Sequence, residues 1–95
     1  MPAYIVAVVN IKDPKPYGEY AALAPAAVAK YGGRFLARGG INAVLEGGLG
    51  ANRVVVTEFS SLETAKAYYN SPEYQAARQK RLGAADFTMM LCDGV

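Results

Sequence analysis

Apolar and polar residues recur along the chain with periods that predict four strands and two helical regions. Residues 3–11 and 53–59 are rich in valine and isoleucine, whose branched side chains favour strands. Residues 17–31 instead carry apolar side chains at spacings of three and four, which is typical of one helical face. The predicted strands span Ala3–Ile11, Arg34–Arg38, Arg53–Phe59 and Phe87–Cys92, and the helices run from Asp13-Pro14 to Gly32-Gly33 and from Ser61 to Gly83.

Capping and breaking residues refine the helical regions. Asp13 can cap the first helix, and Pro14 suits its first turn. Pro25 lies inside the helical pattern and should kink or split the helix near Leu23 or Ala24, because proline lacks a backbone N–H. The second region begins with the capping-box sequence Ser60-Ser61-Leu62-Glu63 and is expected to restart at Ser71-Pro72.

The segment from Gly39 to Asn52 carries five glycines around Val44 and Leu45. We expect a strand extension or a bent hairpin arm here, with a loose turn at residues 47–50. Residues 48–53 resemble a phosphate-binding loop superficially. That reading is rejected, because the third glycine is missing and a strand rather than a helix follows.

The strand faces predict a sheet that is covered on both sides. In the first strand Ile5, Ala7 and Val9 share one face, and the opposite face is also largely apolar. The element order β-α-β-β-α-β predicts a single ferredoxin-like α+β domain over residues 1–95, with an antiparallel sheet and both helices on one face. Since two helices cover only one face, we expect a second copy of the sheet to cover the other in a homodimer.

Composition removes several classes of function. The chain of 95 residues has no histidine and one cysteine, so it cannot build a histidine-dependent catalytic triad, a structural zinc site or an internal disulfide. We therefore expect no metal and no cofactor, and we expect Cys92 to be a small buried residue. The net charge of +2 is weak. Arg78, Lys80 and Arg81 are interpreted as a solvated helix face, so nucleic acid is not an expected partner.

We expect a cytoplasmic protein that does not associate with a membrane. The apolar run from Tyr4 to Val9 is much shorter than the roughly 20 residues that a membrane-spanning helix needs. It is preceded by neither a basic leader nor a cleavage site.

Charged residues in the apolar strands mark the candidate site. If the second strand keeps a regular alternation, Arg34, Leu36 and Arg38 face the space between two sheets together with Val56 and Glu58. Arg38 and Glu58 are the candidate catalytic pair, and Arg34 is a candidate ligand contact. Burying a charge is costly unless it is paired, and such a cost often marks a site. A structural Arg38–Glu58 pair near the strand ends is the alternative.

Tyrosine is abundant, with seven residues. A phenol can donate a hydrogen bond to a ligand or act as an acid, although an amphipathic packing role is the more frequent one. The tyrosines chosen as candidate substrate-binding residues are Tyr17, Tyr20, Tyr69 and Tyr74.

Five motifs in order resemble the domain-of-unknown-function 1330 family over nearly the whole chain. They are Met1-Pro2-Ala3-Tyr4, Tyr17-Gly18-Glu19-Tyr20, the segment from Tyr31 to Gly40, the segment from Val54 to Ser61, and Ser71-Pro72-Glu73-Tyr74-Gln75. The resemblance implies a dimeric α/β barrel and carries over no catalytic residue. Proteins with this barrel include cofactor-independent monooxygenases, lactone isomerases and haem enzymes, and haem is disfavoured here because no axial histidine exists.

Three hypotheses for function follow. The first is a homodimer that binds a small organic molecule and acts as a cofactor-independent enzyme, monooxygenase-like or isomerase-like. In it Arg38 holds an anionic or carbonyl oxygen, Glu58 orients the substrate or moves a proton, and Tyr17, Tyr20 and Tyr69 line the entrance. The second is a non-catalytic binding or stress-response module with the same cavity. The third is a structural assembly whose barrel is filled by side chains.

Overall fold

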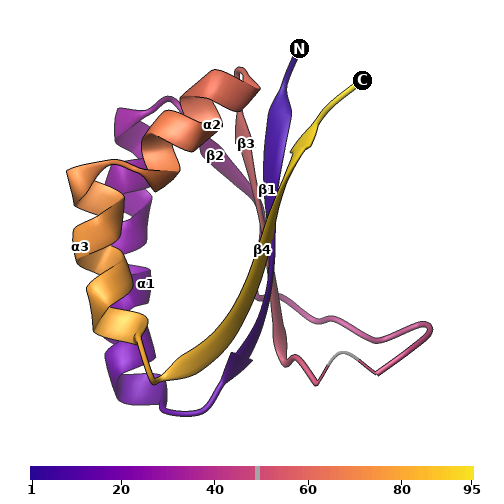
Figure 1. Cartoon of the computed structure of the whole chain (residues 1–95). Helices are drawn as coiled ribbons and strands as arrows, with labels where there is room; N and C mark the ends of the chain where they lie inside the picture. Colours follow the sequence, from indigo (N-terminus) through magenta and orange to yellow (C-terminus); the bar gives the residue numbers. More distant parts are fainter. Residues whose placement is uncertain (49) are drawn as a thin grey trace.

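The fold is a four-stranded antiparallel sheet with all three helices on one face (Figure 1). The computed structural model describes residues 1–48 and 50–95. The strands are β1 (Ala3–Ile11), β2 (Arg34–Arg38), β3 (Arg53–Phe59) and β4 (Ala85–Asp93), in the spatial order β2-β3-β1-β4. The helices are α1 (Pro14–Lys30), α2 (Leu62–Tyr69) and α3 (Pro72–Arg81). This arrangement confirms the predicted ferredoxin-like fold.

The predicted caps set the helix boundaries. The Asp13 side chain accepts a hydrogen bond from the Lys15 amide at 3.4 Å. Ser61 and Ser71 cap α2 and α3 by accepting from the amides three residues later, each at 3.1 Å. α1 continues through Pro25 as one α-helix, so the predicted split of this helix is wrong.

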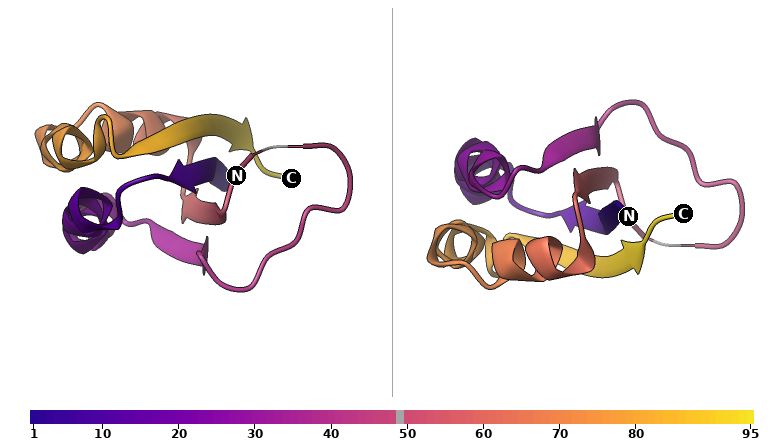
Figure 2. Two further views of the ribbon diagram at one scale, coloured as in Figure 1. Left: turned by 90° about the horizontal axis from the view of Figure 1, so that it is seen from below. Right: turned by 90° about the horizontal axis from the view of Figure 1, so that it is seen from above.

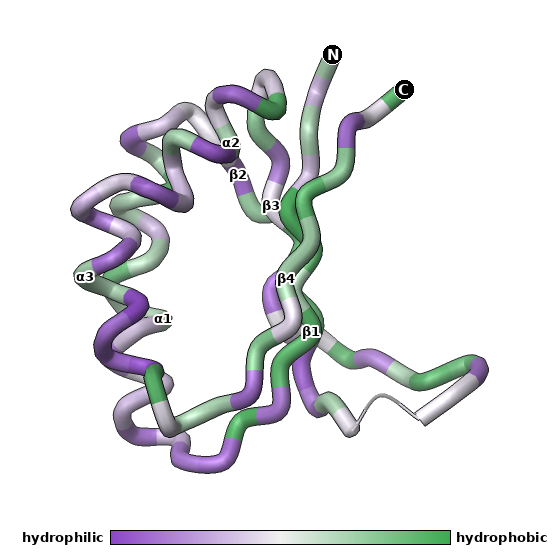
Figure 3. The backbone as a smooth tube through the Cα atoms, viewed as in Figure 1, coloured by the Kyte–Doolittle hydropathy of each residue, from purple (hydrophilic) through white to green (hydrophobic). Residues whose placement is uncertain are grey.

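The two faces of the sheet differ in what covers them. On the helix-covered face, Ile5, Ala7 and Val9 are 6% exposed or less. On the opposite face, which we call the open face, Val6 and Leu36 are 36% and 48% exposed. Apolar colouring runs along the strands in Figure 3 although helices lie on only one side. The prediction that both faces are apolar and only one is covered within the chain is therefore confirmed.

The segment between β2 and β3 extends beyond the sheet, away from the helices (Figure 2). Its described residues form no strand, and Leu45 is 95% exposed, so the predicted strand extension or hairpin arm is wrong. Gly39, Gly47 and Gly50 have positive φ angles, which interrupt an extended backbone. The predicted turn at residues 47–50 includes Leu49, which lies outside the described residues.

Cys92 is exposed rather than buried. It pairs with Tyr4 in the β1–β4 ladder and lies on the open face of the sheet. The expectation of burial assumed that this face was covered, and within one chain it is not.

Candidate functional site

A bulge in β2 decides which charged side chains share a face. Phe35 pairs with Thr57 and Arg38 pairs with Val55, and the register shifts between these two pairs. One extra residue reverses the alternation of a strand from that point on. Arg38 therefore faces the helices together with Phe35, and not the open face that a regular alternation predicts.

Glu58 lies on the opposite side of the sheet from Arg38. Its Oε1 accepts from Arg34 Nε at 2.7 Å, and the two residues are direct cross-strand partners. The Glu58 side chain is 22% exposed and the Arg34 side chain is 71% exposed. The predicted Arg38–Glu58 pair is thus wrong, and Glu58 and Arg34 form a pair on the open face.

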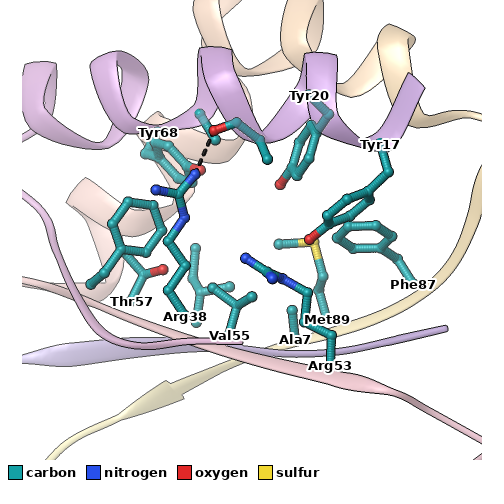
Figure 4. Close-up of a pocket in the computed structure, with 14 residues that line it drawn as sticks. Ala7, Tyr17, Tyr20, Arg38, Arg53, Val55, Thr57, Tyr68, Phe87 and Met89 are labelled. Carbon is teal, nitrogen blue, oxygen red and sulfur yellow. Dashed lines mark hydrogen bonds between the residues drawn. The ribbon is translucent and has the colours of Figure 1, made fainter. Parts of the chain in front are cut away.

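A pocket opens between α1 and the helix-covered face, within a single chain. Its empty volume is about 470 Å³ when the solvent-open space at the mouth is included, and the centre of a water molecule can occupy about 30 Å³ of it. Most of its wall is apolar, with Phe35, Val55, Phe87 and Met89 from the strands. In Figure 4 the Arg38 and Arg53 side chains rise from the sheet, and the hydroxyls of Tyr17 and Tyr20 point down into the space between them. This cavity is the candidate site within one chain, and the expected cavity between the sheets of two copies stays a prediction.

Arg38 is held in place by α1. Pro25 has no N–H, so the Ala21 carbonyl one turn earlier loses its usual helical donor. Arg38 Nη2 donates to that carbonyl instead. The guanidinium carbon also lies 4.7 Å from the centroid of the Phe35 ring. Two contacts on two elements thus fix an arginine that is otherwise exposed at the pocket mouth.

Arg53 is a pocket residue that sequence reasoning missed. Its guanidinium lies above Gly39, where any Cβ atom would overlap Arg53 Nη1, and 5.5 Å from the Tyr17 ring centroid. The Nε atom is buried and has no hydrogen-bond partner among the described residues. A signal was present, because Arg53 is spaced by two and four residues from Val55 and Thr57 and therefore shares their helix-covered face.

Tyr17 and Tyr20 line the pocket from α1, as predicted. Burial raises the pKa of Tyr17, and the positive charge of Arg53 opposes that rise. Burial and the neighbouring hydroxyl of Tyr74 raise the pKa of Tyr20 far above its ordinary value. Both phenols therefore stay protonated at neutral pH, and each can donate a hydrogen bond into the pocket.

The other two candidate tyrosines lie elsewhere. Tyr74 is fully buried behind Tyr20, and their hydroxyl oxygens are 3.0 Å apart. Tyr69 lines a separate cavity between α2 and β4, with Lys66 and Met90. The structure thus brings Arg38, Tyr17 and Tyr20 together and leaves Arg34, Glu58, Tyr69 and Tyr74 outside the pocket wall.

Arg81 is the second residue whose position the sequence reading missed. It is 5% exposed, and its guanidinium carbon lies 3.6 Å from the Phe87 ring centroid. Its Nη2 donates to the Tyr74 hydroxyl at 3.1 Å. The prediction of a solvated basic face is therefore wrong for Arg81. The spacing of Tyr74, Ala77 and Arg81 by three and four residues indicates one buried helix face.

Two further observations concern metal ions and membranes. Across residues 1–48 and 50–95, no three histidine, cysteine or carboxylate side chains gather closely enough to hold a metal ion. None of the helices described has the length and apolarity that spanning a membrane requires.

The fold and the motifs identify the family. The architecture is that of ferredoxin-like α+β proteins, and the family model described as "Domain of unknown function (DUF1330)" matches residues 2–95. The chain belongs to the DUF1330 family, as its resemblance implies. No curated protein matches it.

Solved structures share the fold at low sequence identity. RPA0582 from Rhodopseudomonas palustris, of unknown function, is 18% identical with a TM-score of 0.79, covering 99% of this chain and 82% of that one. A dimeric ferredoxin-like protein of unknown function from Jannaschia sp. CCS1 is 12% identical with a TM-score of 0.81, covering 99% and 100%. SnoaB, a cofactor-independent oxygenase from Streptomyces nogalater, is 10% identical with a TM-score of 0.63, covering 99% and 93%.

Proposed function

We propose that the pocket between α1 and the sheet binds a small organic molecule. The observation that carries this proposal is the convergence of Arg38, Arg53 and two phenols on a cavity whose wall is otherwise largely apolar. A concave apolar wall with a few converging polar groups is the usual form of a small-molecule site. In this proposal Arg38 keeps its predicted role and holds an oxygen of the ligand, and Arg53 instead of Glu58 orients the ligand, without the proton transfer expected of Glu58.

Binding without chemistry is the first form of this proposal. A general base must be able to accept a proton near neutral pH. The side chains described around the pocket include no carboxylate and no histidine, and burial keeps Tyr20 protonated. A proton abstracted here would need another acceptor, such as the substrate itself or a water molecule.

Catalysis without a cofactor is the second form. SnoaB shares the fold and is a cofactor-independent oxygenase. In this form the two arginines and Tyr20 stabilise negative charge that develops on a substrate oxygen, which is the main electrostatic contribution of many active sites. Turnover of a bound molecule without added metal or cofactor supports this form, and recovery of the unchanged molecule after long incubation supports simple binding.

Thermal-shift screening of small organic molecules tests the site. A ligand at 100 times its Kd stabilises the native state by about 2.7 kcal/mol, and the melting temperature rises as a result. We expect hits to be lost in Arg38→Met and retained in Arg34→Met, because Arg34 lies on the open face. Hits that survive in Arg38→Met and Arg53→Met would place the ligand outside this pocket and contradict the proposal.

We further propose that the open face pairs with a second copy to form a homodimer. Its exposed side chains include Val6, Leu36 and Met90, the last of which is 68% exposed. Contiguous exposed apolar surface on a small protein usually marks an interaction site. The related fold from Jannaschia is dimeric, which supports a second copy as the partner.

A further inference from the structure

The pocket contains hydrogen-bond donors and positive charge without a matching anion. Arg38 and Arg53 contribute two guanidinium groups, and neither forms an ion pair with a described residue. Guanidinium groups donate and cannot accept. Arg53 is partly buried, and taking a guanidinium out of water is costly unless an anion balances it. The wall therefore carries an unbalanced positive charge that a ligand could neutralise.

A third arginine lies directly behind this wall. Arg81 is 5% exposed and has no carboxylate within ion-pair distance among the described residues. Its guanidinium carbon is 5.1 Å from the centroid of the Tyr20 ring, and its Nε atom has no described partner. Charge interactions are strong where water is excluded. Arg81 thus adds to the positive potential in the pocket without lining it.

Either hydroxyl can donate in the contact between Tyr20 and Tyr74. The Tyr74 oxygen accepts from Arg81, so its own hydrogen goes either to the Tyr20 oxygen at 3.0 Å or to the Met89 sulfur at 3.6 Å. In the second arrangement Tyr20 donates to the Tyr74 oxygen. A bound anion would favour the first arrangement, in which Tyr74 donates to Tyr20 and the hydrogen of Tyr20 points into the pocket.

We propose that the ligand of this pocket is a small organic carboxylate, held between Arg38 and Arg53 with Tyr20 donating a third hydrogen bond. This inference rests on the proposed binding function and names its ligand class. Arginine matches the two oxygens of a carboxylate in a bidentate geometry. The apolar wall of Phe35, Phe87 and Met89 suits the organic part of the molecule. A single negative charge fits this wall better than a doubly charged phosphate, whose desolvation costs more.

The deciding experiment compares neutral and charged ligands of the same shape. Benzoate against benzamide, and phenylacetate against phenylacetamide, are titrated into the wild-type protein by calorimetry, in a buffer without carboxylate or phosphate. A broader set of matched acid and amide fragments is tested alongside. We expect each acid that binds to do so at least tenfold more tightly than its amide. Equal or tighter binding of the amides would overturn the carboxylate assignment and leave the binding site intact. Absence of binding in both series would overturn both proposals.

Variants assign the preference to the named residues. We expect Arg53→Met to reduce the acid-over-amide preference to near unity, and Arg53→Lys to retain part of it because the charge remains. Arg34→Met is the matched control and should leave the preference unchanged. Tyr20→Phe should weaken carboxylate binding several-fold, whereas Tyr69→Phe should not, since Tyr69 lies outside the pocket. A preference that persists in Arg53→Met and Arg38→Met would contradict the assignment.

Arg81 and Tyr74 are positioning residues, and a double-mutant cycle tests them. If they act through Tyr20, Arg81→Met should lower carboxylate affinity in the wild-type background and have little further effect in Tyr20→Phe. Circular dichroism confirms that each variant is folded. Additive losses would show that Arg81 does not act through Tyr20.

Discussion

Arg38 donates to a carbonyl that Pro25 leaves without a helical donor. The carbonyl belongs to Ala21, one turn before the proline, and Arg38 Nη2 reaches it from β2. A proline inside a helix normally costs stability because a backbone acceptor goes unpaired. Here the unpaired Ala21 carbonyl anchors the Arg38 side chain, which we place at the mouth of the ligand pocket.

Replacing Pro25 with alanine should separate stability from binding. Alanine restores the backbone N–H, which competes with Arg38 for the Ala21 carbonyl, and it is the better helix former by about 3 kcal/mol in a free helix interior. We expect unchanged or higher stability in urea unfolding together with several-fold weaker carboxylate binding. Leu23→Ala, on the exposed side of α1, is the control for helix changes. Unchanged affinity in Pro25→Ala would show that the contact does not position Arg38.

Gly39 leaves the space that the Arg53 guanidinium occupies. It therefore positions Arg53 as Pro25 positions Arg38. Gly39→Ala puts a Cβ atom into the space of the Arg53 guanidinium and also strains a backbone with φ of 72°. We expect a loss of about 1–3 kcal/mol in urea unfolding, the range for strained backbone positions, and a loss of carboxylate preference because Arg53 is displaced.

Two other glycines separate the two effects. Gly83→Ala has a similar φ of 81° with no atom within 4 Å, so it reports the backbone strain alone. Gly40→Ala has neither problem and should be close to neutral. Equal effects on ligand binding in Gly39→Ala and Gly83→Ala would contradict the role of the Gly39–Arg53 contact.

The buried tyrosines predict how stability depends on alkaline pH. Burial is the largest cause that raises the pKa of Tyr20 and Tyr68 well above 10 in the folded state. The unfolded chain releases these protons near pH 10. The folded state is therefore fully favoured below pH 10 and loses stability as the pH rises above that value.

Absorbance and circular dichroism together check this dependence. We expect part of the phenolate absorbance at 295 nm to appear only with the loss of the native circular dichroism signal. Tyr68→Phe keeps the ring and should reduce the slope of stability against pH above 10. Complete ionisation of all seven tyrosines while the native signal persists would contradict the prediction.

A charge on the open face should prevent dimer formation. Val6 and Val56 are cross-strand partners in the middle of this face. Val6→Asp would place an unpaired carboxylate in the proposed interface, which costs several kcal/mol. We expect the wild-type chain to sediment as a dimer and Val6→Asp as a monomer. Leu23→Asp, on α1, should remain dimeric. A monomeric wild-type chain at micromolar concentration would contradict the homodimer.

Most of the fold could be predicted from the sequence because local signals agree with one another. The caps at Asp13, Ser61 and Ser71 and the alternation in β1 all favour the same element order. The segment after β2 was harder, because Val44 and Leu45 suggest a strand by composition. Its described glycines with positive φ angles prevent one.

The site was predicted less well because it depends on side-chain directions. Regular alternation put Arg38 with Glu58, and a register shift that local propensity does not reveal separates them. Composition alone groups Arg81 with Lys80 on a solvated face, because both residues are basic. The helix period places Arg81 with Tyr74 and Ala77, and periodicity was the more informative signal here.

The bulge in β2 decides whether Arg38 contributes its charge to the pocket. Leu36 is the additional residue, between the pairs formed by Phe35 and Ala37. Deleting it would remove the bulge and leave Arg38 opposite Val55, still on the helix-covered face. If the same residues instead formed a strand without a bulge, Arg38 would join the open face, so the bulge and not the identity of any one residue decides which face carries this charge.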